Sequence, residues 1–599
     1  MKAFKNLLET TDAELTPEYE TEVVTCHFTN MVKLLPEKPS AVLRREQLAS
    51  LSGRMCCLKS HHICLFCLLR SAQHVLSCGH TLCDSCAQIF GTPVAGGEYQ
   101  FLVKGCLCCL YPRPLLISVL PPTMSASILA IDGGGVRGVI PLEFLTLAAE
   151  HLAPCSIQDV VDLAIGTSSG ALIALGLFAM SWDVRTCSER FDTLAKRIFS
   201  RRRPSILSML LHRLAGVESR VGGALRSLQW LIQDSCYDSI AFDDALKSVF
   251  GEDRQVFSAP DAKDLSLQRS DSKFGVITTS ISKDTSTFVY FTPADLQGIG
   301  SFQDGGLKYN FAGDIACQIA QQVWPSAVGS LRVLSLGTGK ASHLDQTPHF
   351  RHVFSDGFMR RGFDAWMSTM NTDADWKKWR NRLTDDSKTD SHRLDAPLES
   401  TDSNLDSVES MERLRDLVIL QPGSSRMVRE AVSTLLVSRF FFLIQSVPEQ
   451  ATCPFWCYGT VRCKGPAREI ITALERLHPD GLQYTSQDGY VERFNGVRSI
   501  CDTCGCYYQP MSFLVPHLDQ RVEVFITNTT KKQWRISGFP ATVRQMIHRQ
   551  NFGFSFGRDD HGYPCREDCR SCGKSGIPGG QRRKRRTSLS QSRDLKRVR

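Results

Sequence analysis

The sequence lacks the segments that export or membrane insertion would require. Residues 1–20 are polar and acidic and have neither the basic part nor the apolar part of a secretory signal, so we expect no export. The most apolar runs are 171–180, which is too short to span a bilayer, and 435–444, which Arg439 interrupts. No repeat of solenoid length is present. We therefore predict a cytoplasmic protein with peripheral membrane contact.

The body of the chain also lacks a net charge of one sign. The formal net charge is +8, but residues 582–599 hold nine Lys or Arg and one Asp and account for all of it. A near-neutral body argues against specific nucleic-acid binding. The basic run 582–586 is interpreted as a nuclear signal, a membrane tether or a solubilising tail, so a nuclear location stays open.

The length of 599 residues exceeds what one hydrophobic core usually supports, so several domains are expected. Prolines between 112 and 122 predict a linker, with a boundary near 115–126. Residues 380–410, rich in Asp, Ser, Thr and Arg, are predicted to be a solvated surface excursion. The expected units are an arm (1–55), a cysteine-rich module (56–115), a central unit (126–420, core 126–345), a C-terminal cysteine-containing domain (425–575) and a basic disordered tail (576–599).

The central unit alternates between short apolar runs and helical stretches. Strands that alternate with helices indicate a mostly parallel sheet covered on both faces, a three-layer α/β/α fold. The C-terminal domain is predicted to be small and α+β. The expected strands are 128–131, 160–165, 276–280, 288–291, 333–336, 522–527 and 534–536, and the expected helices are 41–51, 141–151, 171–180 and 408–420.

A G-x-S-x-G turn occupies residues 166–170, between a predicted buried strand and a predicted helix. The two glycines allow a sharp turn, so the Ser168 hydroxyl projects at the carboxyl end of the sheet. The amide of Ser169 points toward the same place from a helix N-terminus. Ser168 is therefore a candidate nucleophile.

A glycine loop, Asp132 to Gly138, follows the first predicted strand. It lacks the G-x-G-x-x-G spacing and the Lys-Ser/Thr of nucleotide-binding loops. Three consecutive glycines, Gly133, Gly134 and Gly135, expose amides that suit an oxyanion hole. A plain glycine-rich turn is the alternative.

A second acidic glycine turn, Asp304-Gly305-Gly306, lies 136 residues after Ser168. An Asp on such a turn can approach the serine and accept its proton without a histidine between them. The competing mechanism is a Ser-His-Asp triad that uses His343, His349 or His352, which lie in a polar stretch and are interpreted as surface residues.

Together these three motifs resemble the patatin-like phospholipase family. The resemblance carries Gly133, Gly134, Gly135 and Arg137 over to the oxyanion loop, Ser168 to the nucleophile and Asp304 to the catalytic Asp. It implies a lipid acyl hydrolase of phospholipase A or lysophospholipase type, with a Ser-Asp dyad and no catalytic metal, acting on phospholipid or other acyl lipids at a membrane in lipid breakdown or remodelling. The sequence departs from the family at 310–312, where Asn-Phe-Ala replaces Asn-Asn-Pro.

Eight Cys and His side chains between 64 and 109 follow a spacing that resembles a RING finger: C-x2-C, ten residues, C-x-H, C-x2-C, nineteen residues, C-x2-C. Pairs of cysteines two residues apart suit structural zinc, and two ions are expected. By the resemblance, Cys64, Cys67, Cys83 and Cys86 hold one zinc and Cys78, His80, Cys106 and Cys109 the other. Cys108 is a possible substitute for Cys109.

The zinc module adds a second functional hypothesis. The combination with the central unit resembles large fungal patatin-like proteins. The alternative function is a RING-containing adaptor or ubiquitin ligase whose hydrolase fold only binds lipid. Leu107, Cys108 and Leu110 depart from active ligases, so docking of a protein partner is favoured over ubiquitin transfer.

Two further features leave open interpretations. Cys501, Cys504 and Cys506 form another zinc site with later cysteines or are free buried thiols. The basic stretch 196–203 before the apolar run 206–214 lies on an anionic membrane or is a solvated face ahead of a core helix. The candidates that follow in the chain are His561, Cys565, Cys569 and Cys572, and Cys453, Cys457 and Cys463, which precede Cys501, are further candidates.

Overall fold

The structure is a computed structural model of the whole chain. It describes residues 40–60, 63–70, 72–94, 98–200, 239–251, 269–270, 272–280, 288–290, 302–307, 309–325, 330–341, 372–398, 407–445, 454–487 and 489–550, with Thr25 and Thr29. The predictions for most of the N-terminal arm, for the segment 201–214, for the basic tail and for the histidines of the rival triad lie outside these residues, as do those for Cys453, His561, Cys565, Cys569 and Cys572.

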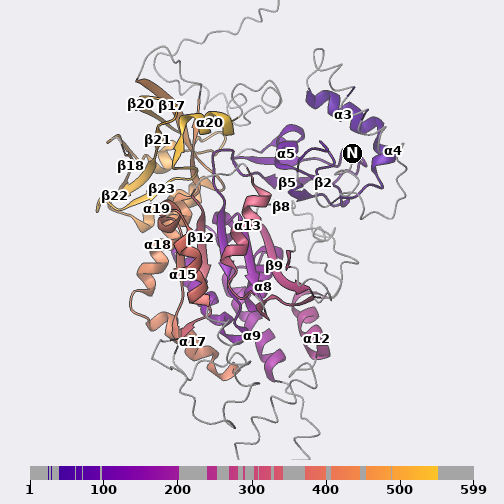
Figure 1. Cartoon of the computed structure of the whole chain (residues 1–599), viewed down its shortest axis with the longest axis vertical. Coiled ribbons are helices and arrows are strands. Elements are labelled where there is room, and N and C mark those ends of the chain that lie inside the picture. Colours follow the sequence, from indigo (N-terminus) through magenta and orange to yellow (C-terminus); the bar gives the residue numbers. More distant parts are fainter. Residues whose placement is uncertain are drawn as a thin grey trace, which may run out of the picture.

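A seven-stranded sheet, as far as the described residues show it, forms the centre of the molecule (Figure 1). Its strands run in the order β10 (Phe288–Tyr290), β9 (Lys273–Ser280), β7 (Leu163–Thr167), β6 (Ser127–Ile131), β12 (Arg332–Leu336) and β14 (His392–Leu394), and β11 (Phe302–Asp304) also pairs with β9. The strands from β9 to β14 are parallel, whereas β10 and β11 run antiparallel to β9. The carboxyl ends of parallel strands lie together at one end of the sheet, and the site described below lies at that end.

The two faces of the sheet belong to two hydrophobic cores. Along β6, Leu129 and Ile131 enter one core, and Ile128 and Ala130 enter the other, as the twofold period of a strand requires. Both faces are therefore buried, and the three-layer α/β fold is confirmed. The first core packs against α6 (Val139–Leu152), α9 (Val184–Ser200), α17 (Met411–Leu420) and α18 (Ser424–Val437), and the second against α13 (Gly313–Val323) and α15 (Thr372–Arg382).

The boundaries of the nucleophile unit differ from the predicted ones. The apolar residues from 160 to 165 are split between the end of the short helix α7 (Ile157–Val160) and the strand β7. The helix after the turn is α8 (Ser169–Ala174), followed by a π-helical turn over Leu175–Ala179. Gly176 lies in this turn, where a side chain would collide with Trp182 and Cys187.

The prediction of a solvated excursion over 380–410 is wrong where that stretch is described. It contains α16 (Asp385–Thr389), the edge strand β14 of the central sheet and the short strand β15 (Pro397–Leu398), which pairs with β13 (Lys340–Ala341). Asp390 and Asp395 are each 6% exposed. These charges are buried because each has an arginine partner, and composition alone does not reveal such pairing.

The cysteine-rich module packs directly on the second face of the sheet. Its residues Phe101 and Ile117 belong to the same core as Ile165 of β7. The segment expected as a linker contains strand β5, which pairs with β8 next to the sheet. The arm contributes α3 (Ser40–Ser50) and α4 (Ser52–Met55). The elements that follow are β1 (His74–Val75), β2 (Thr81–Leu82), α5 (Asp84–Phe90), β3 (Thr92–Pro93), β4 (Gln100–Val103) and β5 (Leu115–Ser118), and the later strand β8 (Arg269–Ser270) pairs with β5.

The C-terminal strands are likewise continuous with the first core, which includes both Phe442 and Leu142. The predicted strands near 522–527 and 534–536 are present. The predicted domain boundaries stay a prediction. The elements are β16 (Phe440–Ile444), β17 (Phe455–Cys463), α19 (Ala467–Leu477), β18 (Leu482–Ser486), β19 (Val491–Arg493), β20 (Gln509–Val515), β21 (Arg521–Val522), β22 (Val524–Asn528), β23 (Gln533–Arg535), β24 (Ala541–Thr542) and α20 (Val543–Arg549).

None of the helices in the described part of the chain is both long and apolar enough to cross a membrane.

A buried ionic cluster ties the central sheet to the C-terminal strands. Asp162, which directly precedes β7, is 2% exposed and accepts hydrogen bonds from Arg439 at 3.0 Å and Lys464 at 2.6 Å. Burial alone would raise the pKa of the Asp162 carboxyl, but these two cations outweigh it and hold the pKa well below its usual range. The ionised carboxylate therefore stabilises the fold at neutral pH, and this stabilisation is lost as the pH falls toward the lowered pKa.

We expect Asp162→Asn to lower the free energy of unfolding by about 3–5 kcal/mol, because two buried cations would lose their counter-charge. Denaturant unfolding at neutral pH measures the difference, which should shrink in acid. The control is Asp519→Asn, since Asp519 is 63% exposed in its pair with Arg544, and its replacement should change the stability far less than that of Asp162. Equal losses in both variants would contradict the prediction.

Candidate active site

Ser168 stands on a strained turn between β7 and α8. Its backbone has φ 52° and ψ −121°, a left-handed conformation that a non-glycine residue adopts at a cost of about 1–3 kcal/mol. The turn is so tight that a side chain on Gly166 would collide with the backbone of Gly170. Strain of this kind persists where the surrounding structure enforces it, and it points the Ser168 hydroxyl outward at the carboxyl end of the sheet.

Asp304 meets this hydroxyl from the same side of β9, because β11 pairs with β9 directly beyond the residues that pair with β7. Asp304 ends β11, and β9 is the neighbour of β7. The Ser168 Oγ donates a hydrogen bond to Asp304 Oδ2 at 2.7 Å, and the Gly306 amide donates to Asp304 Oδ1 at 2.9 Å. The carboxylate is therefore fixed with one oxygen on the serine. The structure brings together the two side chains that the sequence nominated as nucleophile and base.

The glycine loop lies beside the same serine. A side chain on Gly133 would collide with the Asn310 side chain and would lie 3.0 Å from the Ser168 Cβ, so only glycine allows this approach. The Gly133 carbonyl accepts hydrogen bonds from Asn310 Nδ2 at 3.0 Å and Thr338 Oγ1 at 2.7 Å. The loop is thus held from two sides. The family departure at 310–312 leaves Asn310 in this supporting position.

The amides of the loop have different partners. The Gly134 amide donates to Ser169 Oγ at 3.0 Å, and the Gly133 amide lies 3.4 Å from the Asn310 carbonyl. Gly135, with φ 57°, begins a 3-10 helix over Gly135–Gly138, and Ser169 begins α8. The first amides of a helix have no acceptor within it. Gly135 and Ser169 therefore each have an amide without an acceptor inside its own helix, and both amides remain candidate donors to an oxyanion.

Arg137 is buried behind the loop rather than in the open site. It is 6% exposed, and burial lowers the pKa of its guanidinium to about 10. Asp395 is the charge that opposes this shift. Asp395 lies in the stretch that was predicted to be at the surface, so a buried charge cluster there was not expected.

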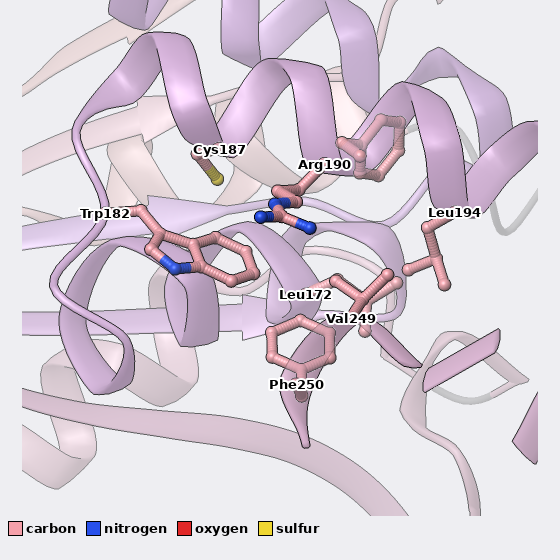
Figure 2. A pocket seen from close by; sticks show the side chains of 8 residues that line it. Leu172, Trp182, Cys187, Arg190, Leu194, Val249 and Phe250 are labelled. Carbon is pink, nitrogen blue, oxygen red and sulfur yellow. The ribbon is translucent and has the colours of Figure 1, made fainter. Parts of the chain in front are cut away.

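An apolar pocket lies against the helix that follows the nucleophile (Figure 2). It encloses about 210 Å³ of empty space, including its mouth. Trp182 stacks on Phe250 with ring centroids 5.4 Å apart, and the Arg190 guanidinium is the charged group at the wall. Leu172, one of the lining residues, belongs to α8, the helix that begins directly after Ser168. The lining residues are Leu172, Trp182, Cys187, Arg190, Phe191, Leu194, Val249 and Phe250.

Two groups of metal-ligating side chains lie in the N-terminal module. Within each group the ligand atoms all lie within 4.8 Å of one another, and the groups are Cys64, Cys67, Cys83 and Cys86, and Cys78, His80, Cys106 and Cys109. This is the pairing expected from the RING resemblance, and it includes Cys109 rather than Cys108. Burial raises the pKa of the Cys64 thiol well above its usual value, and a bound cation would reverse that effect. The donor set fits a structural tetrahedral metal.

Residues 129–316 match the family model described as patatin-like phospholipase. The chain is 27% identical over 186 residues to human calcium-independent phospholipase A2-gamma, covering 30% of this chain and 20% of that protein. It is 34% identical over 88 residues to the Escherichia coli cUMP-AMP-activated phospholipase (15% and 27% covered) and 34% over 105 residues to patatin-like protein 2 of rice, Oryza sativa subsp. indica (16% and 25% covered).

The matched part of this chain therefore spans about a fifth to a quarter of the length of these relatives. Among solved structures, VipD from Legionella pneumophila aligns over 57% of this chain and 71% of that chain, with 12% identity and a TM-score of 0.21. An alignment with so low a score carries no argument about function. The fungal type and the RING identity of the module stay predictions.

Proposed function

We propose that the patatin-like phospholipase domain of this chain, residues 129–316, is a lipid acyl hydrolase that uses Ser168 as nucleophile and Asp304 as base. The observation that carries the proposal is the 2.7 Å hydrogen bond from Ser168 Oγ to Asp304 Oδ2 at the end of a strained turn. The similarity to phospholipases supports a lipid ester as the substrate.

The reaction follows from the positions of these groups. Ser168 Oγ attacks the acyl carbonyl carbon while its proton passes to Asp304 Oδ2. The amides of Gly135 and Ser169 donate to the resulting oxyanion. Collapse of the tetrahedral intermediate releases the alcohol, which takes the proton from Asp304 and leaves an acyl-serine. Water then loses a proton to Asp304 and attacks the acyl carbonyl, and collapse of this second intermediate releases the fatty acid while Ser168 Oγ takes the proton back from Asp304.

The apolar pocket beside α8 gives the acyl chain a place to bind. Its wall is formed by aliphatic and aromatic side chains, among them Leu172, Phe191 and Leu194. We assign phospholipid or other acyl lipids as the substrate class because of the similarity to phospholipases, with the membrane surface as their source.

The N-terminal module holds, in this proposal, two structural zinc ions on its eight Cys and His ligands. The ligand chemistry of four thiolates, and of three thiolates with one imidazole, is typical of structural zinc. Bound zinc would stabilise the module and, through the shared core, the face of the sheet beneath it.

The test uses the purified chain and vesicles of mixed phospholipid and neutral lipid. We expect release of fatty acid, and we expect an organophosphonate probe to block it while modifying one serine, which mass spectrometry identifies as Ser168. The lipid class consumed names the substrate. Absence of acyl release, or inhibition by modification of a different residue, would refute the proposed function.

A further inference from the structure

One arginine outside the matched family region lies at the centre of the polar contacts behind the glycine loop. Arg393 is on β14, directly opposite Ser335 of β12, and its side chain is 5% exposed. Its Nη2 lies 2.9 Å from Asp132 Oδ2 and 2.9 Å from Asp395 Oδ2, and its Nη1 donates to Ser335 Oγ at 2.8 Å. A single guanidinium thus connects two buried carboxylates.

Each carboxylate leads to a loop of the active site. Asp132 immediately precedes the glycine loop, and its Oδ1 accepts the Ala312 amide at 3.2 Å, in the segment that follows Asp304. Asp395 Oδ1 accepts the Gly339 amide at 2.8 Å. The neighbouring Thr338 donates to the Gly133 carbonyl at 2.7 Å. Both routes from Arg393 therefore end at the glycine loop beside Ser168.

Aromatic side chains close the space around the guanidinium. Its Cζ lies 5.9 Å from the ring centre of Phe311 and 6.0 Å from that of Trp376. Trp379 packs against both of these rings, and Thr372 Oγ1 accepts from Nη2 at 2.8 Å. The arginine is thereby held in one orientation, with its planar fork shared between fixed acceptors.

Stability alone does not account for this arrangement. Asp132, Arg393 and Asp395 are all buried, and well-packed apolar residues of the same volume are often as stabilising as a buried ion triad or more so. A charge-assisted hydrogen bond, such as the one from Arg393 Nη2 to Asp395 Oδ2, by contrast fixes the direction of its partner, and the ion pair with Asp132 adds attraction at the second carboxylate. An oxyanion loop requires a fixed orientation of its amides, because the N–H donors must already point to the position of the oxyanion before the negative charge develops.

We propose that Arg393 is a positioning residue that sets the glycine loop and the segment after the catalytic Asp in the geometry that transition-state stabilisation requires. Arg393 acts through Asp132 and Asp395 and does not touch substrate. This inference rests on the proposed function for its kinetic part. Its structural part, the order of the glycine loop, is independent of any activity.

The test compares Arg393→Gln and Arg393→Lys with the wild-type chain. We expect Arg393→Gln to lower kcat about 10²-fold, since small misplacement of catalytic groups has effects of that size. KM should change little, because the apolar pocket is untouched. Arg393→Lys keeps the charge but has no planar fork and should recover part of kcat. All rates are expressed per active site titrated with an organophosphonate.

The matched control is Arg332→Gln. Arg332 is also buried, at 1% exposed, and lies on β12, the strand next to β14, but it starts that strand and donates to the Arg535 and Ile536 carbonyls at 2.8 Å each. This variant should lose stability and keep kcat per titrated site. A fall in kcat that is the same in Arg332→Gln and Arg393→Gln would overturn the inference, because both would then act through general destabilisation.

Hydrogen–deuterium exchange gives a measurement that needs no turnover. Amides of residues 132–138 and 309–313 should exchange faster in Arg393→Gln than in wild type, and should be unaffected in Arg332→Gln. Unchanged exchange in Arg393→Gln would overturn the inference even if the enzyme is active. If wild type releases no acyl group, the proposed function fails, and the exchange experiment still decides the role of Arg393.

Discussion

Replacement of Asp304 by Asn should lower acyl release by about 10²–10⁴-fold while leaving the fold intact, because the substitution removes the base and keeps the shape. The Gly306 amide donates to one oxygen of Asp304 at 2.9 Å and would hold the Asn carbonyl in that position. The Asn amino group would then face Ser168 Oγ, where a proton acceptor is needed. Rates of fatty-acid release from vesicles and of organophosphonate labelling measure the loss.

Two companion variants make this result specific. Ser168→Ala removes the nucleophile and should abolish both release and labelling. Asp375→Asn makes the same chemical change at a residue of α15 whose side chain is 45% exposed, and it should have wild-type rates. Activity of Asp304→Asn within a few-fold of wild type would contradict the Ser-Asp dyad and would favour the rival Ser-His-Asp triad.

Metal removal should have the second large effect, on stability rather than on chemistry. Structural zinc in small peptides contributes about 10–16 kcal/mol of apparent binding free energy at neutral pH, which is comparable to the whole stability of a typical domain. The module shares its core with Ile128 and Ile165 of the sheet. We therefore expect chelation to unfold the module and to lower the thermal midpoint of the chain. Acyl release should also decrease, because the face of the sheet that packs against the module would become exposed to water.

The measurement combines metal content with thermal unfolding. We expect two zinc ions per chain in the described module, and fewer in Cys64→Ser and in Cys106→Ser, one from each group. Cys56→Ser is the matched control, because Cys56 is exposed and belongs to neither group. A metal-free chain with an unchanged thermal midpoint would show that the module is stable without zinc.

Local patterns in the sequence were sufficient to predict the central architecture. The alternation around β6 and β7 and the glycine turns at 132–138 and 166–170 predicted a parallel three-layer fold, because these signals depend only on strand periodicity and on backbone freedom. The candidates Ser168 and Asp304 came from the same short motifs. Their roles stay predictions, although the structure places the two side chains in contact.

Cysteine spacing was equally informative about the N-terminal module. Ligand spacing within a knuckle is a local property, and the structure gathers the eight side chains into the two expected groups. The sequence did not reveal that the module covers one face of the central sheet. That arrangement depends on residues far apart in the chain, such as Ile117 and Ile165, whose burial in one core has no local signal.

Charged residues were the main source of error. By composition, the run around Asp390, Arg393 and Asp395 is typical of a surface, but it supplies an edge strand and a buried charge cluster. A charge enters a core only where partners from other elements satisfy it, and here the partners are more than 100 residues away, at Asp132 and Arg535. The sequence by itself determined the strands, the turns and the candidate nucleophile and base. Only the tertiary structure decided what holds their loops in place, because that depends on charges which become neighbours after the chain has folded.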